Sequence, residues 1–538
     1  MKLEQISLPV SNTLLDDYWS EQASIHSFFS YKFNERSFEE RARYLNQKKY
    51  NRERLAEVIR SYMKRYGMSP QVEQHLQQLQ EGAVAVVGGQ QAGVLTGPLY
   101  SVYKAITVIL LAKEQQEKLN IQVVPLFWVA GEDHDIEEVN HTYTIVDNSV
   151  KKRGYSERSK RKTMASTTEL NKVAMEQFIR TVFKDYGETE HTASLYQNVL
   201  EHLEVSETFS EFFAALMNDL FSRHGLLMID AAYEPFRQYE SEFFQILIQH
   251  NEEISEGVVR QEQALAQAGY GTPIGAEVSN ANLFFVKEGE RFLLERKGDL
   301  YTNGLGYVKF TKEELLQVAK EAPMKLSNNV VTRPLMQEMT IPVLAFVGGP
   351  GELAYWATLK PAFEAIGLQM PIFAPRLNIS IVTRQVETLL KQHQLTVEDA
   401  MKNKVERVKK EFINSIQDEQ ALQQVDKMNE LLQQQYETLH AHLQQAGVSI
   451  DKTIDKNKVY HEMQFTYLKS KIQQSVTLKH ETIISQFDLI SAEIAPNEGF
   501  QERTFNPYQY LNRFGKNLIE DLLELPLKVS PTHYVVKY

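Results

Sequence analysis

The sequence predicts an α/β protein with a parallel, doubly wound sheet and an added helical hairpin. Three observations lead to this fold class. Short apolar runs alternate with helical stretches between residues 83 and 376, which is the pattern of strands joined by crossover helices. Glycine clusters follow two of these apolar runs. Residues 418–495 carry apolar positions spaced by three and four, which is typical of paired helices.

The strands are predicted from continuously apolar runs, which suit parallel strands buried on both faces. The helix after the first strand begins at Pro98, where the missing N–H of proline does no harm, and extends to residue 113. Residues 1–80 are predicted to be helical. The four predicted strands are residues 83–87, 121–129, 226–230 and 341–347.

We expect three parts along the chain. Residues 1–385 form the sheet core, with insertions at about 151–224 and 231–320. Residues 386–500 form a helical, coiled-coil domain, and residues 501–538 return to the core. Within the second insertion, residues 283–310 alternate and turn at glycines, which indicates a small antiparallel subdomain.

The helical region is most simply an antiparallel hairpin that breaks at Gly447. Asn429 is a polar residue at an a-type position, a device that specifies register in coiled coils. Such hairpins bind partners, dimerise or cap a site, and the pattern leaves these alternatives open, with a homodimer expected. The first helix places Leu422, Val425, Asn429, Leu432, Tyr436, Leu439 and Leu443 on its seam, and the second places Leu468, Ile472, Val476, Ile483, Phe487 and Ile490 on one side.

Composition narrows the class of protein. The chain has 538 residues, 43% of them hydrophobic, and a net charge of −12, which argues against a general nucleic-acid partner. No run approaches the ~18 apolar residues of a membrane span, and the N-terminus lacks a signal-peptide pattern. The chain contains no cysteine, which excludes disulfides, cysteine nucleophiles and thiolate zinc sites. A cytoplasmic protein with neither nucleic-acid nor membrane partners is expected.

The first candidate site is the glycine-rich corner between the first strand and its helix. Glycine there is expected where the backbone needs positive φ or must approach a ligand closely, and helix N-termini bind anions. A tight turn is the alternative. The polar candidates around the glycines are Gln90, Gln91, Thr96, Gly97, Tyr100 and Lys104.

The second candidate site follows the second strand, in the segment WVAGEDHDIEEVNH at residues 128–141. A carboxylate cluster at the end of a strand favours binding of a cation, an ammonium group or sugar hydroxyls. Adjacent residues rarely converge on one ion, so recognition of an amine or hydroxyls is favoured over a protein-only metal site, and a solvated loop is the alternative. The candidates are Trp128, Glu132, Asp133, His134, Asp135 and Asn140.

Two further segments complete the predicted site. Lysine and arginine could hold phosphate or carboxylate, arginine through a bidentate fork, and ordinary surface charge is the alternative. The candidates are Lys325, Asn329, Arg333, Gly349, Glu352, Tyr355, Trp356 and Arg376.

Four blocks of the sequence resemble the BshC family, the cysteine-adding enzymes of bacillithiol biosynthesis. They are GQQAGVLTGPLYSVYKAI, PLFWVAGEDHDIEEVNH, NNVVTRPLMQ and VGGPGELAYWATLKPAFE, and they extend over about 83–376. The resemblance implies a ligase that joins the amino group of glucosaminyl malate to the carboxyl of cysteine, with ATP as co-substrate. It also implies a Rossmann-like core similar to the nucleotidyltransferase fold of class I aminoacyl-tRNA synthetases.

The likeness to those synthetases is partial. They often begin their HIGH motif with TGPLH, whereas this chain has Tyr100 and Tyr103 in place of both histidines. The segment KLSNN at 325–329 corresponds loosely to a KMSKS loop. Through this likeness, the amides of residues 89–97 and Lys325 are expected to hold phosphate or the activated carboxyl.

The remaining roles follow from charge. Glu132, Asp133 and Asp135 are expected to hold the amine or sugar hydroxyls, with His134 as proton acceptor, and Arg333 or Arg376 to take a substrate carboxylate. A non-catalytic binding or scaffold protein on a synthetase-like fold is the competing hypothesis. An RNA-directed enzyme is disfavoured by the negative charge.

Overall fold

The computed structural model describes residues 1–8, 12–20, 22–155 and 163–538. The chain divides into two compact units. The first comprises Met1–Val146, Val150–Ile381 and Gln501–Tyr538, and the second comprises Asp147–Ser149 and Val382–Phe500. Within the described ranges, no helix is both long and apolar enough to cross a membrane.

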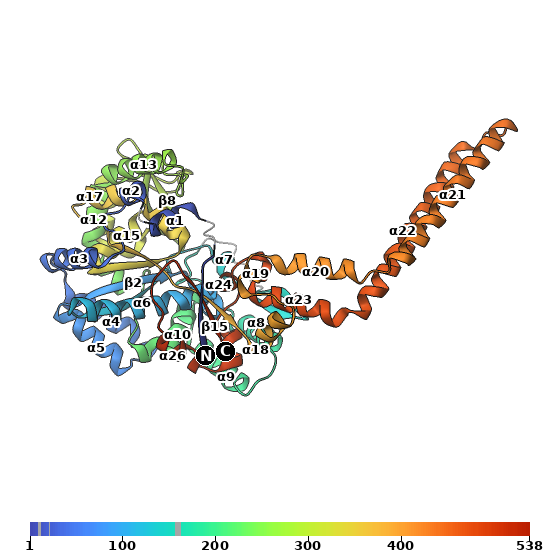
Figure 1. The fold of residues 1–538 in the computed structure, drawn as a ribbon. Helices are drawn as coiled ribbons and strands as arrows, with labels where there is room; N and C mark the ends of the chain where they lie inside the picture. Colours follow the sequence, from blue (N-terminus) through green and yellow to red (C-terminus); the bar gives the residue numbers. More distant parts are fainter. Residues whose placement is uncertain (9–11, 21, 156–162) are drawn as a thin grey trace. The chain divides into compact units, whose positions relative to one another are not determined.

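The core of the first unit is a parallel sheet, which confirms the predicted α/β fold (Figure 1). Among the described residues it has five strands, and their side chains are almost entirely buried. The spatial order is β13 (Ile372–Pro375), β12 (Val343–Gly348), β2 (Val84–Gln90), β3 (Val123–Val129) and β6 (Leu227–Asp230). From β2 the chain adds β3 and β6 on one side of the sheet, and it later adds β12 and β13 on the other side. Ligands of such sheets bind at the carboxyl ends of the strands beside this switch point.

Helix α6 (Leu99–Leu119) packs against β2 and β3. It continues past the predicted end at residue 113, with Gln115 still buried, and it ends at Asn120, whose φ is 52°. The N-terminal helices α3 (Glu35–Gln47), α4 (Arg52–Met63) and α5 (Pro70–Glu81) are capped by Asn34, Asn51 and Ser69, whose side chains each accept a backbone N–H of the first turn.

The prediction of an entirely helical N-terminal region is wrong at its start. Residues Lys2–Ile6 form β1, which pairs antiparallel with β15 (His533–Lys537), and β14 (Asn378–Val382) lies in the same sheet. The strand pairs with the far end of the chain, so no local pattern reveals it. Helices α24 (Gln501–Thr504), α25 (Tyr508–Phe514) and α26 (Asn517–Glu524) precede β15.

An antiparallel sheet occupies the region between β6 and β12, where residues 283–310 are predicted to form one. Its order is β10 (Lys309–Thr311), β9 (Leu300–Thr302), β8 (Glu290–Lys297), β7 (Asn280–Lys287) and β11 (Leu326–Asn328). Between β3 and β6 lie the hairpin β4 (His141–Val146) and β5 (Ser149–Gly154) and the helices α8 (Lys172–Tyr186), α9 (Thr192–Val205) and α10 (Phe209–Phe221).

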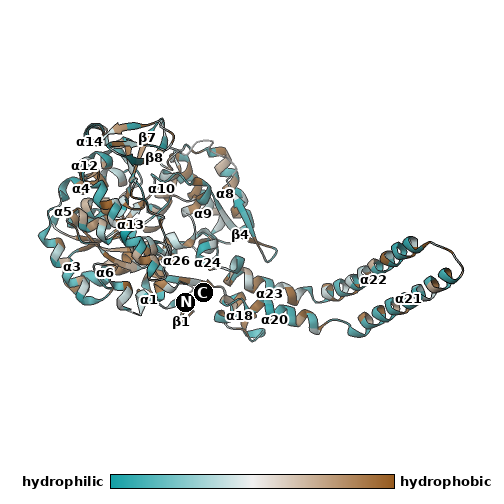
Figure 2. Ribbon diagram, turned by 90° about the horizontal axis from the view of Figure 1, so that it is seen from above, coloured by the Kyte–Doolittle hydropathy of each residue, from teal (hydrophilic) through white to brown (hydrophobic). Residues whose placement is uncertain are grey.

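The second unit contains the predicted helical hairpin, formed by α21 (Glu419–Gln445) and α22 (Asp451–Lys479). Lys469 lies 2.8 Å from Asp426, and the Tyr436 hydroxyl lies 2.7 Å from His461 Nδ1, so the two helices run antiparallel. Figure 2 shows hydrophobic and hydrophilic residues interleaved along both helices.

The predicted seam differs from the structure in detail. Leu439 and Leu468 are 45% and 40% exposed, whereas Phe465 is half-buried. The second helix also ends at Lys479, and Ile483, Phe487 and Ile490 lie on a separate helix, α23 (Glu481–Ile494).

Candidate active site

A pocket of about 390 Å³ lies at the carboxyl ends of the parallel strands. The strand ends β2, β3 and β12 contribute to it, as do the first turns of α6 and of α16 (Pro350–Trp356). Helix α15 (Thr332–Thr340) contributes Arg333, Pro334 and Gln337, and Gln337 lies about one helical turn after the other two. The lining comprises Gly89, Gln90, Gln91, Tyr100, Lys104, Trp128, Ala130, Asp133, Val330, Arg333, Pro334, Gln337, Phe346, Gly349, Pro350, Gly351, Glu352, Tyr355, Arg376 and Arg503.

The structure brings many of the predicted site residues into this lining. These residues come from all four sequence segments, although more than 250 positions separate Gln90 from Tyr355. The predicted residues in the lining are Gln90, Gln91, Tyr100, Lys104, Trp128, Asp133, Arg333, Gly349, Glu352, Tyr355 and Arg376. Outside it lie Thr96, Gly97, Glu132, His134, Asp135, Asn140, Lys325, Asn329 and Trp356.

The turn between β2 and α6 is closed. A Cβ on Gly93 would lie 2.7 Å from the Cα of Gly97, so the two glycines pack backbone against backbone. Thr96 is fully buried with a φ of 67°, and Gly97 has a φ of 71°. The N–H of Leu99, in the first turn of α6, donates to the carbonyl of Phe505 at 2.7 Å. This turn therefore does not fit the phosphate cradle expected from the sequence, because backbone atoms already occupy the space beside it.

Lys104 is buried beside the closed turn and fully engaged. Its ammonium donates to the Gly89 carbonyl at 2.6 Å, to Gln90 Oε1 at 3.0 Å and to Glu352 Oε2 at 2.7 Å. Burial lowers the pKa of Lys104, and Glu352 opposes that shift. The Gly349 N–H donates to the same Glu352 oxygen at 2.8 Å, so this ion pair ties the end of β2 to the end of β12.

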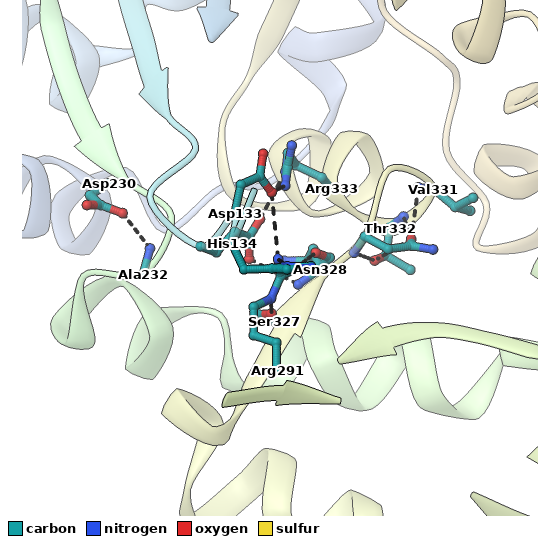
Figure 3. Close-up of polar contacts among 12 residues, drawn as sticks. Asp133, His134, Asp230, Ala232, Arg291, Ser327, Asn328, Val331, Thr332 and Arg333 are labelled. Carbon is teal, nitrogen blue, oxygen red and sulfur yellow. Dashed lines mark hydrogen bonds and ion pairs between the residues drawn. The ribbon is translucent and has the colours of Figure 1, made fainter. Parts of the chain in front are cut away.

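The loop after β3 carries two adjacent carboxylates in opposite environments. Asp133 lines the pocket, and its side chain is 20% exposed and paired with Arg333 (Figure 3). Glu132 is completely buried. It accepts from Arg333 Nε at 2.9 Å, from the Asn328 N–H at 3.1 Å and from Arg237.

The charges beneath the pocket stabilise one another. Burial favours the neutral form of Glu132, but the surrounding guanidinium groups, above all Arg237 and Arg333, outweigh it and lower the pKa of Glu132 to about 2. Arg237 also donates to Glu240 at 2.8 Å, and burial raises the pKa of Glu240 to about 8 against the pull of Arg237. Glu132 is thus a positioning residue for Arg333 and does not reach the pocket, so it cannot hold the amine as predicted.

A buried carboxylate at the end of β6 fixes the same loop from the other side. Asp230 accepts from the hydroxyls of Ser166, at 2.6 Å, and Ser210. It also accepts from the Ala232 N–H at 2.7 Å (Figure 3). The Ser166 N–H donates to the Gly131 carbonyl at 2.9 Å. The turn that presents Asp133 is therefore held by hydrogen bonds to a neighbouring segment.

The remaining residues of the acidic segment lie away from the pocket lining. His134 Nδ1 is 3.0 Å from Arg291 Nη1, which places it toward the antiparallel sheet (Figure 3). The Asp135 side chain is 55% exposed. Asn140 follows α7 (Ile136–Val139), and its carbonyl accepts the Tyr155 N–H at 2.9 Å.

The KLSNN segment is structural in this fold. Its residues 326–328 form β11, and Lys325 is exposed and outside the pocket lining. The Asn329 side chain accepts the N–H groups of Val331 and Thr332 at 2.9 and 3.1 Å, so it caps α15. Trp356 is buried and stacks on Phe346 with ring centroids 4.5 Å apart.

Two domain models of one family together match every residue of the chain except residue 378. Residues 1–377 match the bacillithiol biosynthesis BshC N-terminal Rossmann-like domain, and residues 379–538 match the BshC C-terminal coiled-coil domain. A protein of Lysinibacillus sphaericus (strain C3-41), named "Putative cysteine ligase BshC", is 55% identical over the full length of both chains. Proteins of the same name from Geobacillus sp. (strain WCH70) and Bacillus cereus (strain AH187) are 38% and 34% identical, again over the full length of both chains.

The chain belongs to the BshC family. The family resemblance read from the four sequence blocks is confirmed, as are the Rossmann-like fold, the coiled coil and the assignment to the ligases. The relatives therefore favour an enzyme over the scaffold hypothesis.

In this BshC-family chain, sequence reasoning missed several lining residues. Gln337 is almost fully buried and one turn after Arg333 on α15, so the helical spacing could have revealed it. Arg503 lies on the returning C-terminal segment, far from the four blocks.

Arg376, predicted to take a substrate carboxylate, instead holds Glu502 in a bidentate pair at 2.7 and 2.5 Å.

No cluster of three or more His, Cys, Asp or Glu side chains suited to a metal ion occurs in the part of the chain that the structure describes. The adjacent residues Asp133, His134 and Asp135 do not form such a cluster. Asp133 is paired with Arg333, and His134 lies beside Arg291. The expectation that no metal is needed stays a prediction.

Proposed function

We propose that this chain joins the carboxyl group of cysteine to the amino group of glucosaminyl malate, forming the amide of bacillithiol in the last step of its biosynthesis. The observation that carries the proposal is Asp133. It is an accessible carboxylate in a pocket at the switch point of the sheet, and Arg333 fixes its position. A carboxylate so placed can bind a substrate ammonium group and orient its nitrogen.

The reaction requires the amine to lose a proton before it attacks. Asp133 is the lining carboxylate best placed to accept that proton, since His134 lies outside the lining. The nitrogen then forms the C–N bond to the cysteine carboxyl carbon, and the group that activates the carboxyl leaves. Tyr355 and Gln337, which also line the pocket, are suited to contact sugar hydroxyls.

ATP is proposed as the source of the activating group, because amine and carboxylate otherwise form a salt and not an amide. The closed turn at Gly93–Gly97 does not fit phosphate, so no residue of this chain is assigned to the nucleotide. ATP would supply a leaving group on the carboxyl, and the pocket would supply the position of the amine.

The test is a reconstitution with pure protein, ATP, cysteine and glucosaminyl malate. Mass spectrometry of the thiol product and of the nucleotide would show the amide and distinguish AMP from ADP. Replacing cysteine with serine is the control for the choice of the amino acid that donates the carboxyl group. A protein that binds glucosaminyl malate but forms no amide under any nucleotide condition would contradict the proposal.

We also propose a homodimer formed through the helical hairpin. Large apolar side chains are exposed along α22, including Val459, Met463, Tyr467 and Leu478, and such exposure in a soluble chain favours a protein partner. Met463→Glu should lower the mass measured by light scattering, as should deletion of 418–495, whereas Ser475→Glu on the same helix should not. An unchanged mass in both altered proteins would exclude the hairpin as the interface. The cytoplasmic location, and the absence of nucleic-acid and membrane partners, stay predictions.

A further inference from the structure

The cations that line the pocket differ in how their charge is balanced. Lys104 is paired with Glu352, Arg333 with Glu132 and Asp133, and Arg376 with Glu502. Arg503 is exposed at the edge of the same pocket and has no ion pair or hydrogen bond to any residue that the structure describes. It is therefore the lining cation whose charge is available to a ligand.

The backbone around Arg503 is anchored on both sides. Gln501 accepts the Ile381 N–H at 2.8 Å and donates to the Ile381 carbonyl at 2.8 Å. Glu502 holds Arg376, and the Phe505 carbonyl accepts the Leu99 N–H. A guanidinium on a segment fixed in this way loses little backbone freedom when it binds, which favours affinity.

Tyr100 lines the same pocket as Arg503. Burial raises the pKa of its hydroxyl, while the nearby Arg376 and Arg503 oppose that shift and Glu352 and Glu138 add to it. Within the described part of the chain, the Tyr100 hydroxyl has no hydrogen-bond partner. An exposed guanidinium and a phenol hydroxyl together offer the donors that an oxyanion accepts.

We propose that Arg503 and Tyr100 form a carboxylate subsite that receives the acidic arm of the amine substrate, so that Arg503 determines specificity for an acidic over a neutral aglycone. This inference rests on the proposed function. The amine lies at Asp133, and the carboxylate arm extends to Arg503. The net charge of −12 would otherwise repel such a substrate, so an uncompensated arginine at the pocket edge also favours its entry.

The experiment is a binding cycle, measured by calorimetry on the full-length protein. Its probes are glucosaminyl malate, methyl glucosaminide, L-malate and ATP. Arg503→Gln should lower the affinity for glucosaminyl malate and for L-malate about tenfold to a hundredfold, which is the usual effect of losing a charged hydrogen bond. It should leave the affinity for methyl glucosaminide unchanged. Arg503→Lys keeps the charge without the planar fork of the guanidinium, so its affinities should lie between those of wild type and Arg503→Gln.

Arg513→Gln is the matched control. Arg513 is an exposed arginine on α25 of the same returning segment and outside the lining, so its loss should change none of the four affinities. Melting temperatures should show that both variants are folded, because both side chains are exposed.

Several results would overturn the subsite. Equal affinities of wild type and Arg503→Gln for glucosaminyl malate would do so. The same would follow if Arg503→Gln lost as much affinity for methyl glucosaminide as for glucosaminyl malate. A loss confined to ATP would assign Arg503 to phosphate and not to the substrate carboxylate. If wild type bound L-malate through Arg503 but bound neither glycoside, the carboxylate subsite would stand and the proposed amine substrate would fall. Absence of binding to all four probes would overturn both.

Discussion

Two glycine-rich turns border the pocket, and they have opposite environments. The turn after β2 is filled by its own backbone, since a Cβ on Gly93 would lie 2.7 Å from the Cα of Gly97. The turn after β12 is open at two positions. A Cβ on Gly349 would meet nothing closer than Arg376 Nε at 3.5 Å, and one on Gly351 would meet nothing within 4 Å.

The difference teaches that a glycine cluster at a strand end has two physical explanations. In one turn glycine permits close packing and positive φ, and in the other it leaves space beside the ligand pocket. The same contrast separates Glu132 from Asp133, adjacent carboxylates of which only Asp133 lines the pocket. Mutations of matched pairs can therefore test which residues support the pocket and which contact a ligand.

The largest expected effect comes from the buried carboxylate. Glu132→Gln leaves Arg237 and Arg333 without their shared negative charge, and breaking a buried ion pair reduces the free energy of unfolding by about 3–5 kcal/mol. Urea unfolding at pH 7 measures this loss.

Asp133→Asn is the matched variant, because its side chain is partly exposed and Arg333 keeps Glu132 as a partner. We expect its melting temperature to stay within a few degrees of wild type, while its affinity for glucosaminyl malate falls about tenfold to a hundredfold. If the two variants lost stability equally, the distinction between support and lining would fail here.

A smaller effect on stability is expected at the closed turn. Gly93→Val introduces atoms where the backbone of Gly97 already lies, and overpacking of this kind typically destabilises by about 1–3 kcal/mol. Gly351→Ala places its methyl group in open space at the start of α16 and should be neutral or slightly stabilising, since alanine favours helix over glycine by up to ~1 kcal/mol. Thermal unfolding compares the two. Unchanged stability in Gly93→Val would mean that the turn can open, and the phosphate cradle would become tenable again.

The sequence predicted the parallel sheet apart from β13, and it led to a candidate site at the carboxyl ends of the strands, because both depend on local patterns. Apolar runs that end in glycine or acidic residues revealed β2, β3, β6 and β12, and strand ends of a parallel sheet meet at one edge. What it missed depends on distant partners. Strand β1 needs β15, and Arg503 reaches the pocket from a segment more than 100 residues beyond the last sequence block.

The sequence also could not show which individual side chains are buried. Glu132 and Asp133 are adjacent acids in an acidic loop, and nothing in that segment indicates that Arg237, a hundred positions later, pairs with the first of them. Lys325 and Asn329 resembled a phosphate loop by spacing alone. They lie at the two ends of β11, whose pairing with β7 is not visible in five residues.

The subtlest prediction concerns Glu240, beneath the pocket. Burial raises the pKa of Glu240 to about 8, from an ordinary value of 4.5. Between these two values the folded protein holds a proton that the unfolded chain has released, so the contribution of Glu240 to stability decreases as pH rises from about 4.5 to about 8. Glu240→Gln keeps an uncharged acceptor for Arg237, which retains Glu132, and removes this titration.

We therefore expect the melting temperature of the variant, minus that of wild type, to increase from pH 5 to pH 8 and then to level off. Other buried acids such as Glu338, whose pKa burial raises to about 7, are common to both proteins and cancel in the difference. A difference that stayed constant with pH, or that decreased, would show that Glu240 is ionised throughout and that the buried layer has a different charge balance from the one inferred.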